Sequence, residues 1–89
     1  MIVEFDKSFL KSLDKIKDSK VFPKIKSIIT EIEKAQSLNE LKSVKKLIGF
    51  KNYYRIRLGK YRLGFEVIDS ITVRLIIIAH RKDIYRIFP

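Results

Sequence analysis

The chain has no cysteine and a single histidine, His80. The absence of cysteine excludes disulfides and thiolate metal sites and is typical of the reducing cytoplasm, and one histidine cannot form a histidine-rich metal site. The longest purely apolar run, residues 75–79, is too short to cross a bilayer, and no signal peptide is visible. Three glycines, two prolines and an apolar fraction of 46% in 89 residues argue against disorder. These features predict one cytoplasmic domain, residues 1–89, with no cofactor, metal or membrane association.

Acidic residues are the scarce charged type. Ten of them stand against twenty Lys and Arg, which gives a net charge of +10. All six arginines follow residue 50, whereas the first half uses lysine alone. The planar arginine side chain can bind a phosphate through two donors at once, whereas lysine is a hydrated point charge. The second half is therefore expected to bind nucleic acid, an acidic protein, or both.

Residues 53–65 alternate in polarity on both sides of Gly59-Lys60, which predicts a β-hairpin closed by a two-residue turn. That turn places Arg57 directly across from Arg62, with Arg55 on the same face. Like charges opposite each other destabilise a sheet, so the pattern indicates that an anion such as a phosphate binds there. A solvated face of splayed arginines is the alternative that the hairpin alone leaves open.

The rest of the chain predicts a strand, two helices and a connection before the hairpin. Residues 2–5 form a β-type run, and Asp6 is placed to cap a helix whose apolar positions run to Ile16. Pro23 fits the first turn of a second one-sided helix, and residues 37–40 have the capping-box spacing of one more helical turn.

The hairpin's second strand is expected to run to Asp69 and to be followed by a strand over 72–80. A loop of residues 69–71 places Glu66 opposite Arg74 as an ion pair. The same register places Ile78 opposite Arg62 and His80 near Lys60, beside the arginines. After that strand, Ile84, Ile87 and Phe88 are expected to pack down, with Tyr85 folded back toward the arginine face.

Residues 47–88 resemble the RelE/ParE superfamily of type II toxin–antitoxin toxins. The resemblance is carried by residues 53–59 (YYRIRLG), 61–67 (YRLGFEV) and 80–86 (HRKDIYR). It implies an α+β fold of about four antiparallel strands, in the order β-α-α-β-β-β, with a helical hairpin on one face and a basic face opposite.

For function, the resemblance implies a toxin that arrests translation. RelE-like members cut mRNA in the ribosomal A site without a metal ion, through attack of the substrate's 2′-hydroxyl on the adjacent phosphate. A ParE-like inhibitor of DNA gyrase and a non-toxic, degenerate binding module are the alternatives. The expected partners are the mRNA in the A site and a cognate acidic antitoxin, which could neutralise the arginines or displace the C-terminal segment.

Residue by residue, the resemblance implies two sets of site residues. The catalytic candidates are Arg55, Arg57, Arg62, His80, Arg81 and Tyr85, and the substrate-binding candidates are Tyr53, Lys60 and Lys82. RelE itself has lysines where Arg55 and Arg57 stand. Because arginine stays protonated at neutral pH, His80 is the favoured acid–base group.

Overall fold

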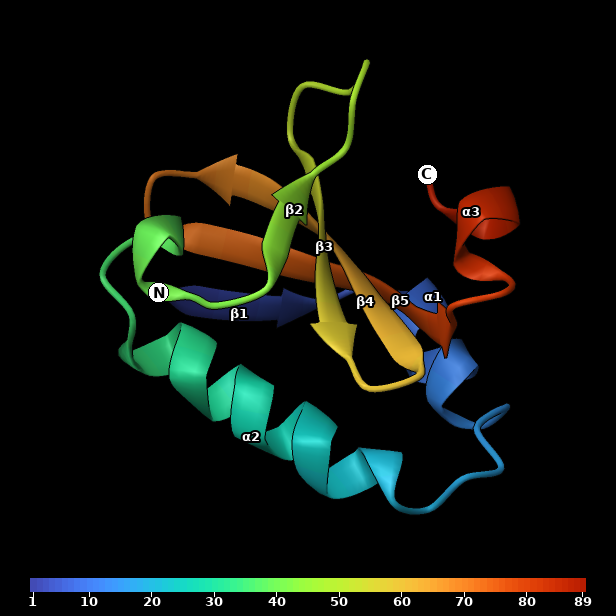
Figure 1. Ribbon diagram of the computed structural model, residues 1–89. Helices are drawn as coiled ribbons and strands as arrows, with labels where there is room; N and C mark the ends of the chain where they lie inside the picture. The colour runs from blue at the N-terminus through green and yellow to red at the C-terminus, as the bar shows by residue number, and fades with distance from the viewer.

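The computed structural model describes residues 1–89 and has an α+β fold with one five-stranded sheet (Figure 1). The sheet order is β1-β5-β4-β3-β2. The strands are β1 (Ile2–Phe5), β2 (Val44–Lys46), β3 (Tyr53–Leu58), β4 (Tyr61–Asp69) and β5 (Thr72–His80). The helices are α1 (Lys7–Leu13), α2 (Val21–Lys34) and α3 (Ile84–Ile87), with a 3₁₀ turn over Leu38–Glu40. None of the helices combines the length and apolar character needed to span a membrane.

The predicted α+β class is confirmed, but the strand count and the directions differ. β2 is an additional strand, and β1 pairs in parallel with β5 while the other pairs are antiparallel. The sheet is therefore mixed, because the two helices carry the chain from β1 to the opposite edge before it returns through β3, β4 and β5.

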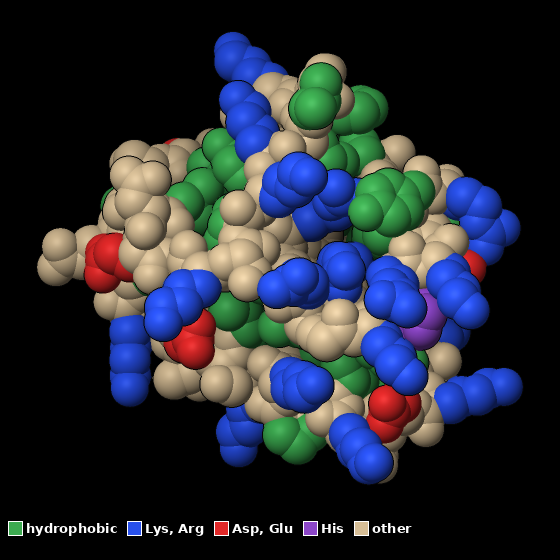
Figure 2. All heavy atoms as spheres, viewed as in Figure 1, with side chains coloured by type: hydrophobic (Ala, Val, Ile, Leu, Met, Phe, Trp, Pro, Cys, Tyr) green, Lys and Arg blue, Asp and Glu red, His purple; other side chains and the backbone are tan.

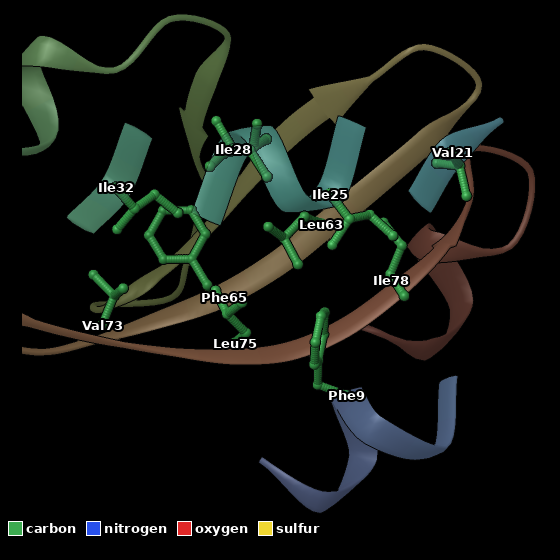
Figure 3. Packing of buried hydrophobic residues seen from close by; sticks show 11 residues of the cluster. Phe9, Val21, Ile25, Ile28, Ile32, Leu63, Phe65, Val73, Leu75 and Ile78 are labelled. Carbon is green, nitrogen blue, oxygen red and sulfur yellow. The ribbon is translucent and has the colours of Figure 1, made fainter. Parts of the chain in front are cut away.

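The main core lies between α1, α2 and one face of the sheet (Figure 3). The apolar stripe of α2 packs against the inward-facing residues of β3, β4 and β5, and Phe9 of α1 closes one side. The buried members are Phe9, Val21, Ile25, Ile28, Ile32, Ile56, Leu63, Phe65, Val73, Leu75 and Ile78. Burial of such large side chains supplies most of the driving force for folding.

A smaller cluster lies on the opposite, open face of the sheet. Leu47, Ile84 and Phe88 are buried there against Tyr53 and parts of β5. This confirms that Ile84 and Phe88 pack down, whereas the same expectation for Ile87 is wrong, since it is 48% exposed. α3 is a single turn long, so only two residues of the C-terminal segment can face the sheet.

The helix caps follow the sequence closely. The Asp6 carboxylate accepts hydrogen bonds from the Ser8 amide (3.0 Å) and the Ser8 hydroxyl (2.6 Å). The Ser8 hydroxyl and then the Ser8 amide lower the pKa of Asp6 below its ordinary value. α1 nevertheless ends at Leu13, so Ile16 packs on the core from the following turn.

The hairpin register is confirmed: Arg57 pairs with Arg62, and Arg55 with Gly64. The predicted pairing of Glu66 with Arg74 also holds, but the ion pair of Arg74 is made with Glu4 of β1, at 3.0 Å. The parallel neighbour β1 reaches Arg74 from the other side of β5, which local spacing does not reveal.

The last part of β5 is shifted by one residue relative to the prediction. Phe65 pairs with Leu75 but Gly64 pairs with Ile77, so Ile76 is an extra residue, a β-bulge. Ala79 therefore lies opposite Arg62, and His80 lies opposite Tyr61. Two serines of α1 hold the bulged strand: the Ser8 hydroxyl shares its single proton between the Asp6 carboxylate and the Ile76 carbonyl, and the Ser12 hydroxyl accepts from the Ile78 amide.

Candidate functional site

The candidate site is a basic pocket on the open face of the sheet. It has a volume of about 390 Å³ and is formed by the ends of β2, β3 and β4 together with α3. Its lining residues are Ser43, Val44, Lys45, Arg55, Arg57, Arg62 and Tyr85. Figure 2 shows Lys and Arg side chains gathered over the middle of the viewed face, with Asp and Glu toward its margins.

The strand pairing brings the cations of the pocket together. Arg57 faces Arg62 on one side of β3, and Lys45 faces Arg55 on the other. The two ion pairs of the molecule, Arg74–Glu4 and Arg86–Asp83, lie elsewhere, so none of these four cations is neutralised by a carboxylate. Two adjacent like-charge pairs destabilise the sheet unless an anion binds between them.

Two of the arginines are held in defined positions. Arg62 Nη1 donates to the carbonyls of Gly59 (2.8 Å) and Tyr61 (2.9 Å), which fixes it at the hairpin turn. The guanidinium carbon of Arg55 lies 4.5 Å from the centre of the Tyr85 ring, a cation–π contact. Tyr85 is 69% exposed.

His80 does not line this pocket. Since His80 pairs with Tyr61, and the next inward pair on the same face is buried Leu63 with Ile78, His80 lies on the helix-covered side of the ladder. Its ring lies 5.6 Å from the Tyr61 ring, and its Nδ1 accepts the Lys82 amide at 3.2 Å. The bulge at Ile76 thus removes His80 from the arginine face on which the sequence placed it.

The other predicted residues are also outside the pocket lining. Arg81 and Lys82 are exposed in the turn after β5, and Lys60 is exposed at the hairpin turn, where its carbonyl accepts the Arg81 amide. Tyr53 lies on the open face but packs edge-on against Phe88, with ring centres 5.5 Å apart. Among the nine predicted site residues, the structure therefore brings together Arg55, Arg57, Arg62 and Tyr85.

Sequence reasoning missed Lys45 and Ser43. The Ser43 carbonyl accepts the Arg57 amide at 3.3 Å, and Ser43 has a left-handed backbone (φ 61°), unusual for a residue other than glycine. The signal was the Val-Lys-Lys run of residues 44–46, which can be a short edge strand, but the helical turn predicted at residues 37–40 drew attention away from it.

A second, larger cavity of about 600 Å³ lies between α1, α3 and the C-terminal end of β5. His80, Tyr61 and Asp83 line it together with Lys11 of α1 and Lys15 and Lys17, which follow that helix. It is less suited to phosphate chemistry than the basic pocket, since Asp83 and its Arg86 partner both line it and no arginine without an ion pair does. No three His, Asp or Glu side chains lie close enough together to hold a metal ion.

The chemistry available in the basic pocket is that of an anion site. Four cations, Tyr85 and Ser43 line the pocket, and no carboxylate does. Such a site can bind a phosphodiester, stabilise negative charge that develops on it, and pass a proton through a hydroxyl group.

Comparison with known proteins agrees with this description. A family model described as the ParE toxin of the parDE type II toxin–antitoxin system matches residues 3–85. The chain is 46% identical, over 91 residues and the full length of both, to the Toxin RelE3 of Methanocaldococcus jannaschii.

Solved structures give the same result. The RelB–RelE antitoxin–toxin complex from Methanococcus jannaschii contains a chain with 42% identity and a TM-score of 0.81, over 97% of this chain and 99% of that one. The Escherichia coli RelBE complex contains one with 28% identity and a TM-score of 0.68, over 89% and 94%. The molecule is thus an α+β domain of the RelE-like kind. The chain belongs to the ParE toxin family of type II toxin–antitoxin systems, within the RelE/ParE superfamily.

Proposed function

We propose that this toxin arrests translation by cutting mRNA in the ribosomal A site. The observation that carries the proposal is the pocket in which Lys45, Arg55, Arg57 and Arg62 converge with Tyr85 and no carboxylate. A site for gyrase contact alone needs no such convergence of cations around one pocket. The relatives named as RelE toxins support the same assignment.

In the proposed reaction the 2′-hydroxyl oxygen of the substrate forms a bond to the adjacent phosphorus, and the bond from phosphorus to the 5′-oxygen breaks. The 2′-hydroxyl gives its proton to solvent water, and the leaving 5′-oxygen takes one from the Tyr85 phenol, which solvent then reprotonates; the products are a 2′,3′-cyclic phosphate and a 5′-hydroxyl. No resident metal ion takes part. Arg55, Arg57 and Arg62 stabilise the charge on the phosphoryl oxygens, and Tyr85, whose phenol is in the pocket, donates the proton to the leaving oxygen.

Direct cleavage measurements test this assignment. Purified toxin is added to programmed ribosomes, and the cut sites and end groups of the mRNA are mapped with and without a chelator. Arg57→Gln and Tyr85→Phe should each lower the rate by about 10²–10³-fold, the usual cost of losing one stabilising or proton-transfer group. His80→Gln, outside the pocket, should have a smaller effect. Intact mRNA with wild-type toxin would refute the proposal.

Inhibition of DNA gyrase is the second candidate. It is favoured by one observation: the matching family model describes a ParE toxin. A supercoiling assay with purified gyrase separates the two, because the RelE-like activity leaves supercoiling unaffected. A toxin inactive in both assays and harmless when expressed would be the degenerate binding module.

We also propose that a cognate acidic antitoxin binds the chain. The solved relatives include antitoxin–toxin complexes, and a net charge of +10 with an arginine-lined face favours an acidic partner. Coexpression with the product of the adjacent reading frame should yield a stable complex without cleavage activity.

A further inference from the structure

The open face of the sheet contains one buried position without a side chain, Gly64 of β4. It lies directly opposite Arg55 of β3, and the Phe88 ring lies on its α-carbon. A Cβ atom built on Gly64 would be 2.7–2.8 Å from three carbon atoms of that ring. Real Cβ atoms do not approach other atoms within 3.0 Å, so the ring can occupy this place only because residue 64 is glycine.

Phe88 is one of two anchors that hold the C-terminal segment on the sheet. Phe88 is 5% exposed and Ile84 is fully buried, and the Phe88 amide donates to the Ile84 carbonyl at 3.0 Å. The residue between them that enters the basic pocket, Tyr85, is itself largely exposed. Its position therefore depends on the docking of its neighbours and on its contact with Arg55.

We propose that Gly64 and Phe88 are positioning residues for Tyr85. The bare α-carbon of Gly64 admits the Phe88 ring, the docked ring fixes α3, and α3 holds the Tyr85 phenol over the Arg55 guanidinium. The expected effect on turnover rests on the proposed function, in which Tyr85 acts on the phosphate. The placement itself is a separate claim about the structure.

A methyl group at residue 64 is the direct perturbation. In Gly64→Ala the Phe88 ring must leave its place, α3 must shift, and Tyr85 must move away from Arg55. A displacement of about 1 Å at a reacting group can cost on the order of 100-fold in rate. We therefore expect turnover in the ribosome assay to fall by about 10–100-fold, while the main core between the helices and the sheet stays intact.

The position of Tyr85 can be read without RNA. Incorporation of 3-fluorotyrosine gives one ¹⁹F resonance for each of the four tyrosines, and Tyr85→Phe assigns the relevant one. Gly64→Ala should shift the Tyr85 resonance and leave that of Tyr54, which is stacked on Phe65 in the core, unchanged. Ile32→Val is the matched control, because it weakens the main core on α2 and should not move the Tyr85 resonance.

A compensating change tests the steric mechanism. Leucine is shorter than phenylalanine, so Gly64→Ala combined with Phe88→Leu should restore both the Tyr85 resonance and turnover toward the values of Phe88→Leu alone. An unshifted Tyr85 resonance in Gly64→Ala would overturn the inference. So would a double variant whose loss of turnover is the sum of the losses in the two single variants. A shifted resonance with full turnover would support the placement of Tyr85 and refute its role in the proposed reaction.

Two further outcomes separate the inference from a variant that does not fold and from a failure of the proposed function. If Gly64→Ala does not fold, Phe88→Leu and Phe88→Ala must shift the Tyr85 resonance for the inference to stand. If the wild-type protein cuts no RNA, the proposed function fails, whereas the ¹⁹F measurement still decides whether Gly64 and Phe88 position Tyr85.

Discussion

Neutralising Arg57 should make the toxin more stable and less active at the same time. Arg57 is exposed and lies directly opposite Arg62. Its amide donates to Ser43 rather than toward β4, so the two arginines form a non-hydrogen-bonded pair, in which side chains are closest. Lys45 and Arg55 line the same pocket. Within the basic pocket Arg57 therefore has three cationic neighbours and no acidic one.

The size of the effect follows from Coulomb's law. Two unit charges about 7 Å apart in water repel each other by about 0.6 kcal/mol. Salt at about 0.1 M roughly halves this repulsion energy. With three neighbours, and some loss of contacts made by the arginine stem, Arg57→Gln should raise the free energy of unfolding by about 0.5–1 kcal/mol in low salt. For a domain of this size that corresponds to an increase of about 2–8 °C in Tm.

The assay is thermal or urea unfolding at several salt concentrations. Arg57→Lys keeps the charge and should show little gain, and Lys26→Gln removes an exposed charge from the middle of α2, so it reports the effect of net charge alone. The gain in the free energy of unfolding in Arg57→Gln should vanish near 1 M salt, where the screening length is about 3 Å. An equal gain in Lys26→Gln, or none in Arg57→Gln, would show that the arginine face is not under electrostatic strain.

Two further predictions concern α1. Ser12→Ala leaves the buried Ile78 amide without its acceptor and should lower the free energy of unfolding by about 1–3 kcal/mol, measured by urea denaturation; an unchanged value would mean that the amide finds another partner. Asp6 has a lowered pKa through its hydrogen bonds from Ser8, so its carboxylate stabilises the fold above the ordinary pKa of 3.8, and this contribution is lost as the pH falls through the lowered value. Asp6→Asn keeps an acceptor that does not titrate and should lose less stability than wild type between pH 5 and pH 2; parallel unfolding curves of the two proteins against pH would contradict this.

The hairpin could be predicted from the sequence because its register is a local property. A two-residue turn at Gly59-Lys60 leaves one pairing that keeps the apolar positions on one face. The three arginines on the opposite face followed from that pairing alone. The core stripe of α2 was equally predictable, since its buried residues recur at helical spacing.

The end of β5 could not be predicted in the same way. Residues 75–78, Leu-Ile-Ile-Ile, are all apolar, so alternation gives no information about which of them faces the helices. The bulge at Ile76 depends on contacts with α1, a helix that lies far from Ile76 in the sequence. For this reason the sequence placed His80 one residue away from its actual pairing and on the wrong side of the sheet.

The pocket was recognisable only in part for a related reason. Arg55, Arg57 and Arg62 lie on one hairpin, whereas Lys45 joins them through a three-residue edge strand. So short a strand is defined by its hydrogen bonds to β3 and leaves almost no periodic signal. Tyr85 reached the pocket as expected, because Ile84 and Phe88 on either side of it are strongly apolar.

The two serines of α1 also give the bulged strand an unusual dynamic property. The Ile78 amide is bonded to a side-chain hydroxyl of a seven-residue helix and not to a neighbouring strand. Its hydrogen exchange should therefore follow the detachment of α1 from the sheet, while amides of β3 and β4 follow opening of the sheet itself. Because residues 75–79 are uniformly apolar, we expect such detachment to let this end of β5 slide by one residue, a shift that the hydrogen bonds of the two hydroxyl groups oppose.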